Sequence, residues 1–187
     1  VSLFRAQDEA VDTTNSATSF MDMGIAQGAH LRPVGGMGAY GREIADFNNL
    51  VGKDMAVLMD FAPWSTFDPY LLDQIREGLS ADRHPAIMLS WEPGNSSNGF
   101  DLWYNGGPGP LTSIVSGRCD SYIRSFARAL KSRPERFLIR LAHEMNISDP
   151  PWWPGHYGQD ASAYVAMWRH VHSIFEAEGV SNVEWVW

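Results

Sequence analysis

The sequence predicts an α/β fold built on a parallel sheet. Short apolar runs of strand length alternate with longer segments whose apolar residues recur at helical spacing, giving five strands and four helices. Strands that alternate with helices form parallel sheets joined by right-handed crossovers. Polar residues also recur where the apolar runs end, at Asp60, Glu92 and His143–Glu144. Such strand ends are typical of a (β/α)₈ barrel, whose active site lies at the carboxyl edge of the sheet.

The first third of the chain divides into two parts. Residues 1–36 are rich in polar and turn-forming residues without a helical or strand period, and we interpret them as a lead-in or linker. The predicted barrel domain spans residues 37–187. It begins with a glycine-punctuated strand, MGAYG, over residues 37–41. A helix follows, indicated by three apolar residues at helical spacing: Ile44, Phe47 and Val51.

The middle of the chain contains two continuous apolar strands. Residues 55–61 form the first and residues 85–92 the second, and a helix capped by Asp68 and Pro69 lies between them. The segment 95–117 is rich in Gly, Ser, Asn and Pro but carries aromatic residues, Trp103 among them. Loops of this length are usually functional or disordered, and we consider a substrate-facing wall and simple packing as equal alternatives.

The last third of the chain repeats the pattern. An amphipathic helix over residues 118–133 stops at Pro134, and the strand 137–141 is apolar except for Arg140. A second amphipathic helix runs over residues 161–179, and the chain closes with the strand 182–187.

Two architectures fit this order of elements. An open doubly wound sheet loses support because neither a G-x-G-x-x-G nor a Walker sequence follows the first strand. A complete barrel takes eight strands and about 250 residues. We therefore expect an incomplete (β/α)₈ barrel that lacks strands six to eight.

Composition narrows the class of partner. The formal net charge of −8 without basic clusters argues against nucleic acid and against anionic membrane surfaces. No apolar run approaches the length of a membrane span. The single cysteine, Cys119, reads as structural. His170 and His172 are two apart on a predicted helix and face different directions, so we expect neither metal nor other cofactor.

The segment that carries the chemistry is FLIRLAHEMNISDPPWWP, residues 137–154. Hydrolysis of a glycosidic bond needs two carboxyl groups, one of which protonates the leaving oxygen. Glu144 follows an apolar strand and precedes a Pro- and Trp-rich loop, so we expect a partly enclosed, apolar setting of the kind that suits a proton donor. The alternative is an ordinary glutamate at a strand end.

HEMN, the tryptophan pair after it, and the stretch YVAMWRHVHSIFEAEGVSNVEWVW together resemble the family 26 glycoside hydrolases, best known as β-mannanases. The resemblance is strong over residues 137–187 and weaker back to residue 37. It implies a retaining (β/α)₈ glycosidase with Glu144 as general acid/base. The family's nucleophile follows strand seven, so the resemblance places it outside this chain and suggests a fragment.

The resemblance also implies a set of substrate-binding residues. His143 and Asn146 belong to the HEMN motif, Trp152 or Trp153 matches an aromatic platform, and Arg140 matches a residue that supports the carboxylates. Arg140 fits a buried ion pair equally well. The remaining candidates line the ends of strands one and three: Tyr40, Trp91 and Glu92.

The implied activity is endo-hydrolysis of β-1,4-mannan outside the cytoplasm, in the extracellular space or the periplasm. The segment between Asn146 and Trp152 is longer than in the family, which keeps mixed-linkage β-glucan and β-xylan open as substrates. A non-catalytic carbohydrate-binding protein is the alternative of a different class. A substitute nucleophile within the chain would be Glu92 or Asp60.

Overall fold

The computed structural model describes residues 28–30, 40–64, 70–77, 85–94 and 108–187. Five parallel strands form one sheet in the order β1-β2-β3-β4-β5, so every strand pairs with its neighbour in sequence. A doubly wound sheet reverses its strand order at a switch point, and no reversal occurs among these strands. The order is that of consecutive β/α units of a barrel, as the sequence predicted.

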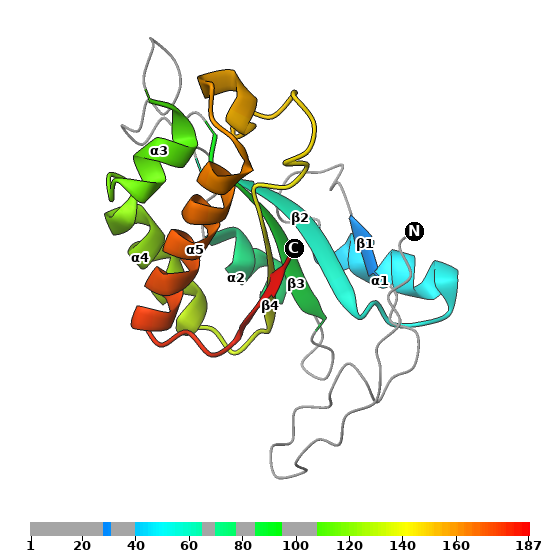
Figure 1. Ribbon diagram of the computed structural model, residues 1–187. Helices are drawn as coiled ribbons and strands as arrows, with labels where there is room; N and C mark the ends of the chain where they lie inside the picture. The colour runs from blue at the N-terminus through cyan, green and yellow to red at the C-terminus, as the bar shows by residue number, and fades with distance from the viewer. Residues whose placement is uncertain (1–27, 31–39, 65–69, 78–84, 95–107) are drawn as a thin grey trace, which may run out of the picture.

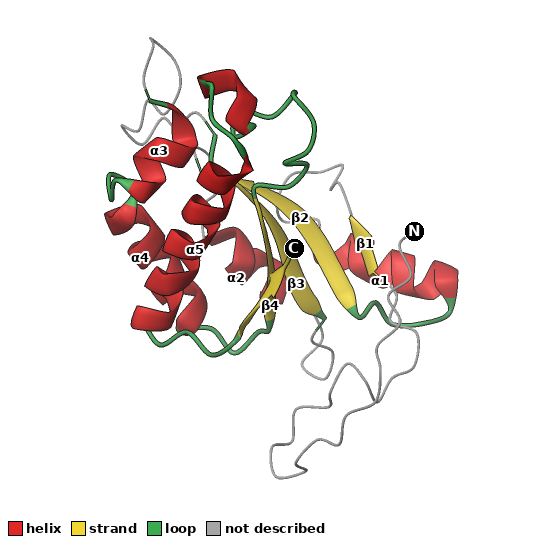
Figure 2. Cartoon of the chain, in the orientation of Figure 1, coloured by secondary structure: helices red, strands yellow, loops and turns green. Residues whose placement is uncertain are grey.

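The strands alternate with helices along the chain. β1 (Gly28–His30), β2 (Val57–Pro63), β3 (Ala86–Glu92), β4 (Phe137–Leu141) and β5 (Val183–Val186) form the sheet. The helices are α1 (Tyr40–Val51), α2 (Tyr70–Glu77), α3 (Gly109–Val115), α4 (Asp120–Lys131) and α5 (Ala161–Ala177), with a 3₁₀ turn, η3 (Pro154–Tyr157), before α5. Figures 1 and 2 show α3, α4 and α5 gathered on one side of the strands.

Helix α5 shows why these residues form these elements. Asp160 is its N-cap, and the Asp160 carboxylate accepts a hydrogen bond from the Ser162 backbone N–H at 2.8 Å. Tyr164, Met167, Val171, Ile174 and Phe175 form the buried stripe that faces the core. Gly179, just past the helix, has a φ of 67°, which a glycine adopts at little cost.

The main core lies between the sheet and the helices. Leu89, Trp91, Phe137 and Ile139 are fully buried and belong to one cluster with apolar side chains of α4 and α5. The opposite face of the sheet carries Met59, Phe61, Met88, Ser90, Leu138 and Arg140, which alternate with these core residues. Except for Ser90, they are only partly buried among the described residues. In a barrel this second face is the interior, and we call it the inner face.

The amino edge of the sheet is tied together by Asn182. Its Nδ2 donates to the backbone carbonyls of Leu130, Arg133 and Glu135 at 2.9, 3.0 and 3.0 Å. The backbone carbonyl of Asn182 accepts the Phe137 N–H at 2.9 Å. One side chain therefore joins the end of α4 to the start of β4 and β5, away from the carboxyl edge.

The predicted first strand is wrong. Residues 37–39 lie outside the described residues, and Tyr40 begins α1 instead of ending a strand. The first strand that the structure describes is Gly28–His30, inside the segment that we predicted to be a lead-in, so the sheet reaches back at least to residue 28. A Cβ on Gly28 would lie 2.9 Å from the Val57 carbonyl oxygen. Glycine there permits the close approach of two strands.

The predicted loop over residues 95–117 is also partly wrong, because residues 109–115 form α3. Trp103 lies outside the described residues. In the part of the chain that the structure describes, no helix has the length and hydropathy needed to cross a lipid bilayer.

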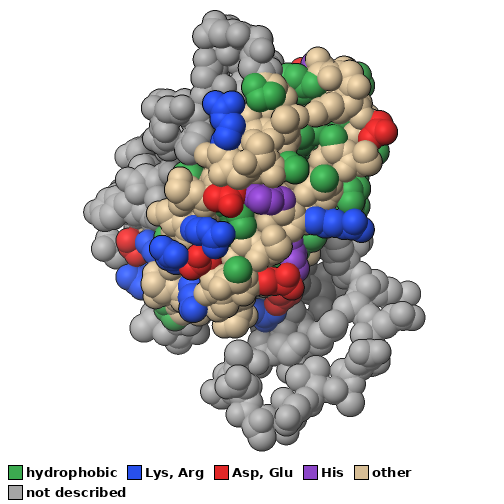
Figure 3. Space-filling model, turned by 60° about the vertical axis from the view of Figure 1, so that its left-hand side comes forward, with side chains coloured by type: hydrophobic (Ala, Val, Ile, Leu, Met, Phe, Trp, Pro, Cys, Tyr) green, Lys and Arg blue, Asp and Glu red, His purple; other side chains and the backbone are tan. Residues whose placement is uncertain are grey.

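Charges of both signs alternate over the face that carries α4 and α5 (Figure 3). Glu178 pairs with Arg124 at 3.2 Å and Arg128 at 2.7 Å, and Lys131 donates to the Glu178 backbone carbonyl at 2.8 Å. Among the described residues of this face, neither sign builds a continuous patch.

Candidate active site

Glu144 lies in a tight turn at the carboxyl end of β4. The turn, residues 141–144, contains two non-glycine residues with positive φ, Ala142 at 50° and Glu144 at 57°. L-residues rarely adopt this left-handed region, and strained backbone of this kind is concentrated at functional sites. The strain therefore supports a functional assignment of the residue that the sequence analysis singled out first. Throughout, we call residues 141–144 the β4 turn.

Every backbone carbonyl of the β4 turn accepts a hydrogen bond. The Tyr164 hydroxyl from α5 donates to Leu141 O and Ala142 O, both at 3.0 Å. The Trp152 indole N–H donates to His143 O at 2.6 Å, and the Ile147 N–H donates to Glu144 O at 3.2 Å. On the other side, the Ala142 N–H donates to Trp91 O at 3.0 Å, which joins the turn to β3.

Ser90, Glu92 and Arg140 meet on the inner face. Ser90 pairs in register with Arg140, and the Arg140 Nε donates to the Ser90 hydroxyl at 3.0 Å. Glu92 follows two residues after Ser90 on the same face of the strand. Arg140 is thus held by a hydrogen bond within the sheet, and its positive charge acts on Glu92.

His143 bridges the inner face and the loop after β4. Its ring packs edge-on against Phe61 and Trp152, with centroids 5.6 and 5.4 Å apart. Its Nε2 lies 3.8 Å from the Glu92 carboxylate, and its side chain is 12% exposed. Nδ1 is buried without a hydrogen-bond partner in the described residues. A histidine fixed on two sides in this way presents one polar edge toward Glu92.

The electrostatics of this group follow from burial and from its neighbours. Burial raises the pKa of Glu92, an effect that Arg140 opposes and the negative charge of Glu144 reinforces. Burial also lowers the pKa of His143, with Arg140 acting in the same direction and Glu144 against it. His143 is therefore biased toward the neutral form, in which one ring nitrogen donates and the other accepts.

The loop after β4 packs against α3. The Trp153 indole packs against Gly155 and leaves no room there for a side chain. Its ring centroid lies 5.1 Å from that of His156. Tyr157 covers Gly109 at the start of α3, and Gln159 donates to the Thr112 hydroxyl at 2.6 Å. Trp153 is half-buried. One flat ring is thus held partly exposed on a braced loop.

The structure separates the predicted site residues into two groups. Glu92, Arg140, His143 and Glu144 lie together at the carboxyl edge of β3 and β4. Glu144 is exposed rather than enclosed, because the loop's Trp152 packs against His143 instead. Asn146 is exposed on the following turn. Trp152 is 4% exposed and supports the backbone of the turn rather than offering an open platform.

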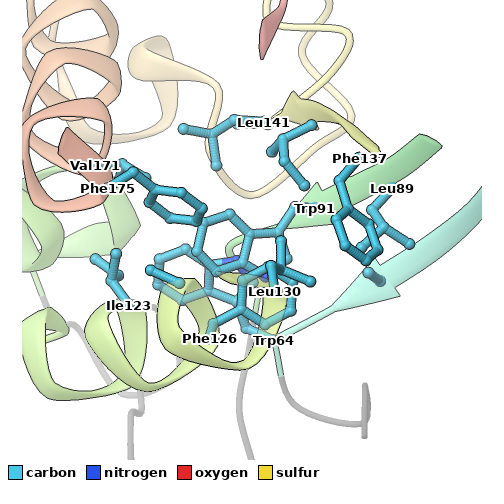
Figure 4. Close-up of a cluster of buried hydrophobic side chains, with 14 of the residues drawn as sticks. Trp64, Leu89, Trp91, Ile123, Phe126, Leu130, Phe137, Leu141, Val171 and Phe175 are labelled. Atoms are coloured by element: carbon cyan, nitrogen blue, oxygen red, sulfur yellow. The ribbon is translucent and has the colours of Figure 1, made fainter. Parts of the chain in front are cut away.

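Trp91 does not line the site. Its side chain is fully buried on the helix side of β3, where it stacks on Phe126 with ring centroids 4.3 Å apart (Figure 4). Because side chains alternate along a strand, Trp91 and Glu92 necessarily face opposite sides of the sheet. Asp60 also points to the helix side, with Leu58 and Ala62, and away from the inner face. For Tyr40 only the backbone is described, at the start of α1.

Three contributors escaped the sequence analysis. Phe61 and Ser90 read as parts of apolar strands, and Tyr164 read as one residue of an amphipathic stripe. Strand alternation offers a signal for the first two, since Ser90 shares its face with Glu92. For Tyr164 no local signal exists, because its acceptors are 23 and 22 residues away in sequence.

Among the described residues, no group of three or more His, Cys, Asp and Glu side chains is close enough to hold a metal ion. Glu92, Glu144, His143 and Arg140 supply two carboxyl groups, an imidazole and a guanidinium, which can transfer protons and form hydrogen bonds to hydroxyl groups.

Comparison with known proteins finds similarity to glycosidases. No model of a known protein family matches the chain. Over 150 residues it is 30% identical to Endoglucanase H of Acetivibrio thermocellus, a match that covers 76% of this chain and 14% of that protein. The structure resembles that of a β-mannanase from a symbiotic protist of the termite Reticulitermes speratus, solved with a gluco-manno-oligosaccharide. The TM-score is 0.53 at 19% identity, covering 86% of this chain and 55% of the mannanase. Both matched proteins are named as glycosidases, and the similarity to each extends over most of this chain.

These matches support the resemblance to the family 26 glycoside hydrolases that HEMN and the residues around it carry. The described residues form five consecutive β/α strands of a barrel, and the chain spans about half of the mannanase chain and a seventh of Endoglucanase H. The likeness to the mannanase also confirms the incomplete barrel that the sequence predicted.

Proposed function

We propose that this family 26 domain is part of a retaining endo-acting glycoside hydrolase that cleaves β-1,4-linked polysaccharide, with β-mannan as its substrate. The observation that carries the proposal is the placement of Glu144. It is presented by a strained turn at the carboxyl edge of barrel strand β4, beside His143 and Glu92. This edge is where (β/α)₈ barrels carry their catalytic groups.

Glu144 acts first as acid and then as base. Its carboxyl group protonates the leaving glycosidic oxygen, and its carboxylate later removes a proton from the water that releases the sugar. Its exposure suits this role, since the polymer must reach the carboxyl group from solvent. His143, biased toward its neutral form, donates to or accepts from a sugar hydroxyl or Glu92.

The nucleophile of the proposed reaction lies outside these 187 residues. A retaining mechanism needs two carboxyl groups on opposite sides of the anomeric carbon, about 5–5.5 Å apart. Glu92 is on β3, next to β4, so it approaches the sugar from the same side as Glu144. Burial also keeps its pKa raised, which favours the less nucleophilic protonated form. Asp60 is on the opposite face of the sheet.

Trp153 provides a second element of substrate recognition. A half-buried indole braced from below by Gly155 offers a flat apolar face on which a sugar ring can stack. Asn146 is exposed on the same loop and can bond a hydroxyl group. The gluco-manno-oligosaccharide bound by the structural relative supports mannose- or glucose-based chains over β-xylan.

We also propose that the enzyme acts outside the cytoplasm, because its polymeric substrate does not cross membranes. No cofactor is required, since carboxyl groups alone carry both steps of the reaction.

The test is release of reducing ends from β-mannan, mixed-linkage β-glucan and β-xylan by the natural protein that contains these residues. We expect the highest rate on β-mannan and a loss of about 10²–10⁴-fold in the Glu144→Gln variant. Asp149→Asn is the matched control, because Asp149 is an exposed carboxylate in the same loop and the change is of the same kind. Full activity of Glu144→Gln would overturn the assignment. Binding of oligosaccharides without any turnover would favour a non-catalytic carbohydrate-binding protein instead.

A further inference from the structure

The β4 turn is held by two buried aromatic side chains from different parts of the chain. Tyr164, 5% exposed on α5, donates its single hydroxyl proton between Leu141 O and Ala142 O. Trp152, 4% exposed in the loop after β4, donates to the next carbonyl along, that of His143. The carbonyls of three consecutive peptide groups are therefore bound by side chains, and the first of these groups is also bound to β3 through the Ala142 N–H.

The peptide groups held in this way determine where Glu144 points. Ala142 and Glu144 occupy the left-handed region, which is unfavourable for residues with a Cβ and persists only when the surroundings enforce it. Rotation of the Leu141, Ala142 and His143 peptides would relieve this strain, and each rotation would break one of the hydrogen bonds to Tyr164 or Trp152. The two side chains thus oppose the relaxation that would redirect the carboxyl group.

We propose that Tyr164 and Trp152 are positioning residues for the proton transfer by Glu144. The inference rests on the proposed function, because it assigns a purpose to the geometry of the same site. Neither side chain reaches the substrate: both are buried beneath the turn, and their polar atoms are used by backbone carbonyls. Burial raises the pKa of Tyr164 to about 12, so its hydroxyl remains a donor throughout the pH range of glycosidases.

A misdirected acid has a specific kinetic consequence. Protonation matters most when the leaving group is a sugar, whose alkoxide is a poor leaving group, and little when the leaving group is a stable phenolate. Displacement of a catalytic group by about 1 Å can cost about 10²-fold in rate. A general loosening of the domain would instead affect both kinds of substrate equally.

The experiment compares kcat/KM in the intact parent enzyme for two substrates, a manno-oligosaccharide and a 2,4-dinitrophenyl β-glycoside. The variants are Tyr164→Phe, which removes only the hydroxyl, and Trp152→Phe, which keeps a ring but loses the N–H. Tyr122→Phe is the matched control, because Tyr122 is a partly buried tyrosine on α4 whose ring packs against Trp64 and Trp91. Thermal unfolding is recorded for each variant.

We expect Tyr164→Phe and Trp152→Phe to lower kcat/KM on the oligosaccharide about 10- to 100-fold and on the aryl glycoside less than about threefold. Tyr122→Phe is expected to leave both values unchanged. Equal losses on the two substrates, or no loss on either, would overturn the proposal even if the variants melt at lower temperature. Glu144→Gln separates the two hypotheses. If Glu144→Gln retains activity on the oligosaccharide, the proposed function fails. If Glu144→Gln loses this activity while Tyr164→Phe and Trp152→Phe keep it, only the positioning role fails.

Discussion

Replacing Trp91 by leucine tests whether the most buried tryptophan near the site serves the core or the substrate. Trp91 is fully buried and packs against three aromatic rings. The distances between ring centroids are 4.3 Å to Phe126, 4.8 Å to Trp64 and 5.9 Å to Phe175. Truncation of a buried Trp to Ala typically costs about 3–5 kcal/mol, and aromatic pairs add about 0.5–1.5 kcal/mol beyond their buried area. Leucine refills part of the space, so we expect the free energy of unfolding to fall by about 2–4 kcal/mol.

The assay is urea denaturation followed by far-ultraviolet circular dichroism, which does not depend on the tryptophan that is removed. With a slope of about 2 kcal/mol per molar urea, the midpoint should fall by about 1–2 M. Trp153→Leu is the comparison, because Trp153 is half-buried on a loop and should cost less than about 1 kcal/mol. Affinity for manno-oligosaccharides is measured for both variants without urea.

The two variants should therefore show opposite patterns. Trp91→Leu should lose stability and keep its affinity for the oligosaccharide, whereas Trp153→Leu should keep stability and lose affinity. If Trp91→Leu weakens binding while its stability stays within about 0.5 kcal/mol of the unchanged protein, the placement of Trp91 on the helix side of β3 is refuted.

Three other predictions concern stability and reactivity. Burial raises the pKa of Glu92, so ionisation of this carboxyl opposes folding once the pH exceeds the pKa that Glu92 has in the unfolded chain. Glu92→Gln should therefore stabilise the protein more at pH 7 than at pH 3, as measured by urea titration. An equal effect at both pH values would contradict this. Cys119 is fully buried and burial raises its pKa to about 11, so 5,5′-dithiobis(2-nitrobenzoic acid) should label one thiol only after unfolding, and rapid labelling of the folded protein would count against the structure. Asn182→Ala should lower the free energy of unfolding by about 1–3 kcal/mol, because two amide protons lose their backbone acceptors at about 0.5–1.5 kcal/mol each. The kcat of this variant should be unchanged. A loss of activity at unchanged stability would argue against a purely structural role of Asn182 at the amino edge.

The strands β2 to β5 and the helices α1, α2, α4 and α5 could be predicted because each rests on local patterns. Continuous apolar runs mark strands that are buried on at least one face, and the stripe on α5 ends at a glycine in the expected place. The first strand could not be found in this way. Gly28 resembles a turn residue in sequence, and only its approach to Val57 shows that it belongs to a strand.

The position of Trp91 illustrates a different limit. An apolar run such as Ala86–Trp91 contains residues for both faces of the sheet, so its composition does not say which face meets the helices. The alternation rule separates Trp91 from Glu92, but the choice of face follows from pairing with β4, where Ser90 meets Arg140. By this rule Trp91 and Glu92, as neighbours on one strand, cannot both lie at the site.

The sequence alone determined the α/β class and the incomplete barrel, and it singled out Glu144 as the candidate central residue, because periodicity and the HEMN motif are local properties of the chain. Only the tertiary structure decided how Glu144 is presented. The left-handed turn is enforced by Tyr164 and by β3, which approach it from distant parts of the chain. Conformations that a residue does not favour by itself depend on contacts that exist only once the chain has folded.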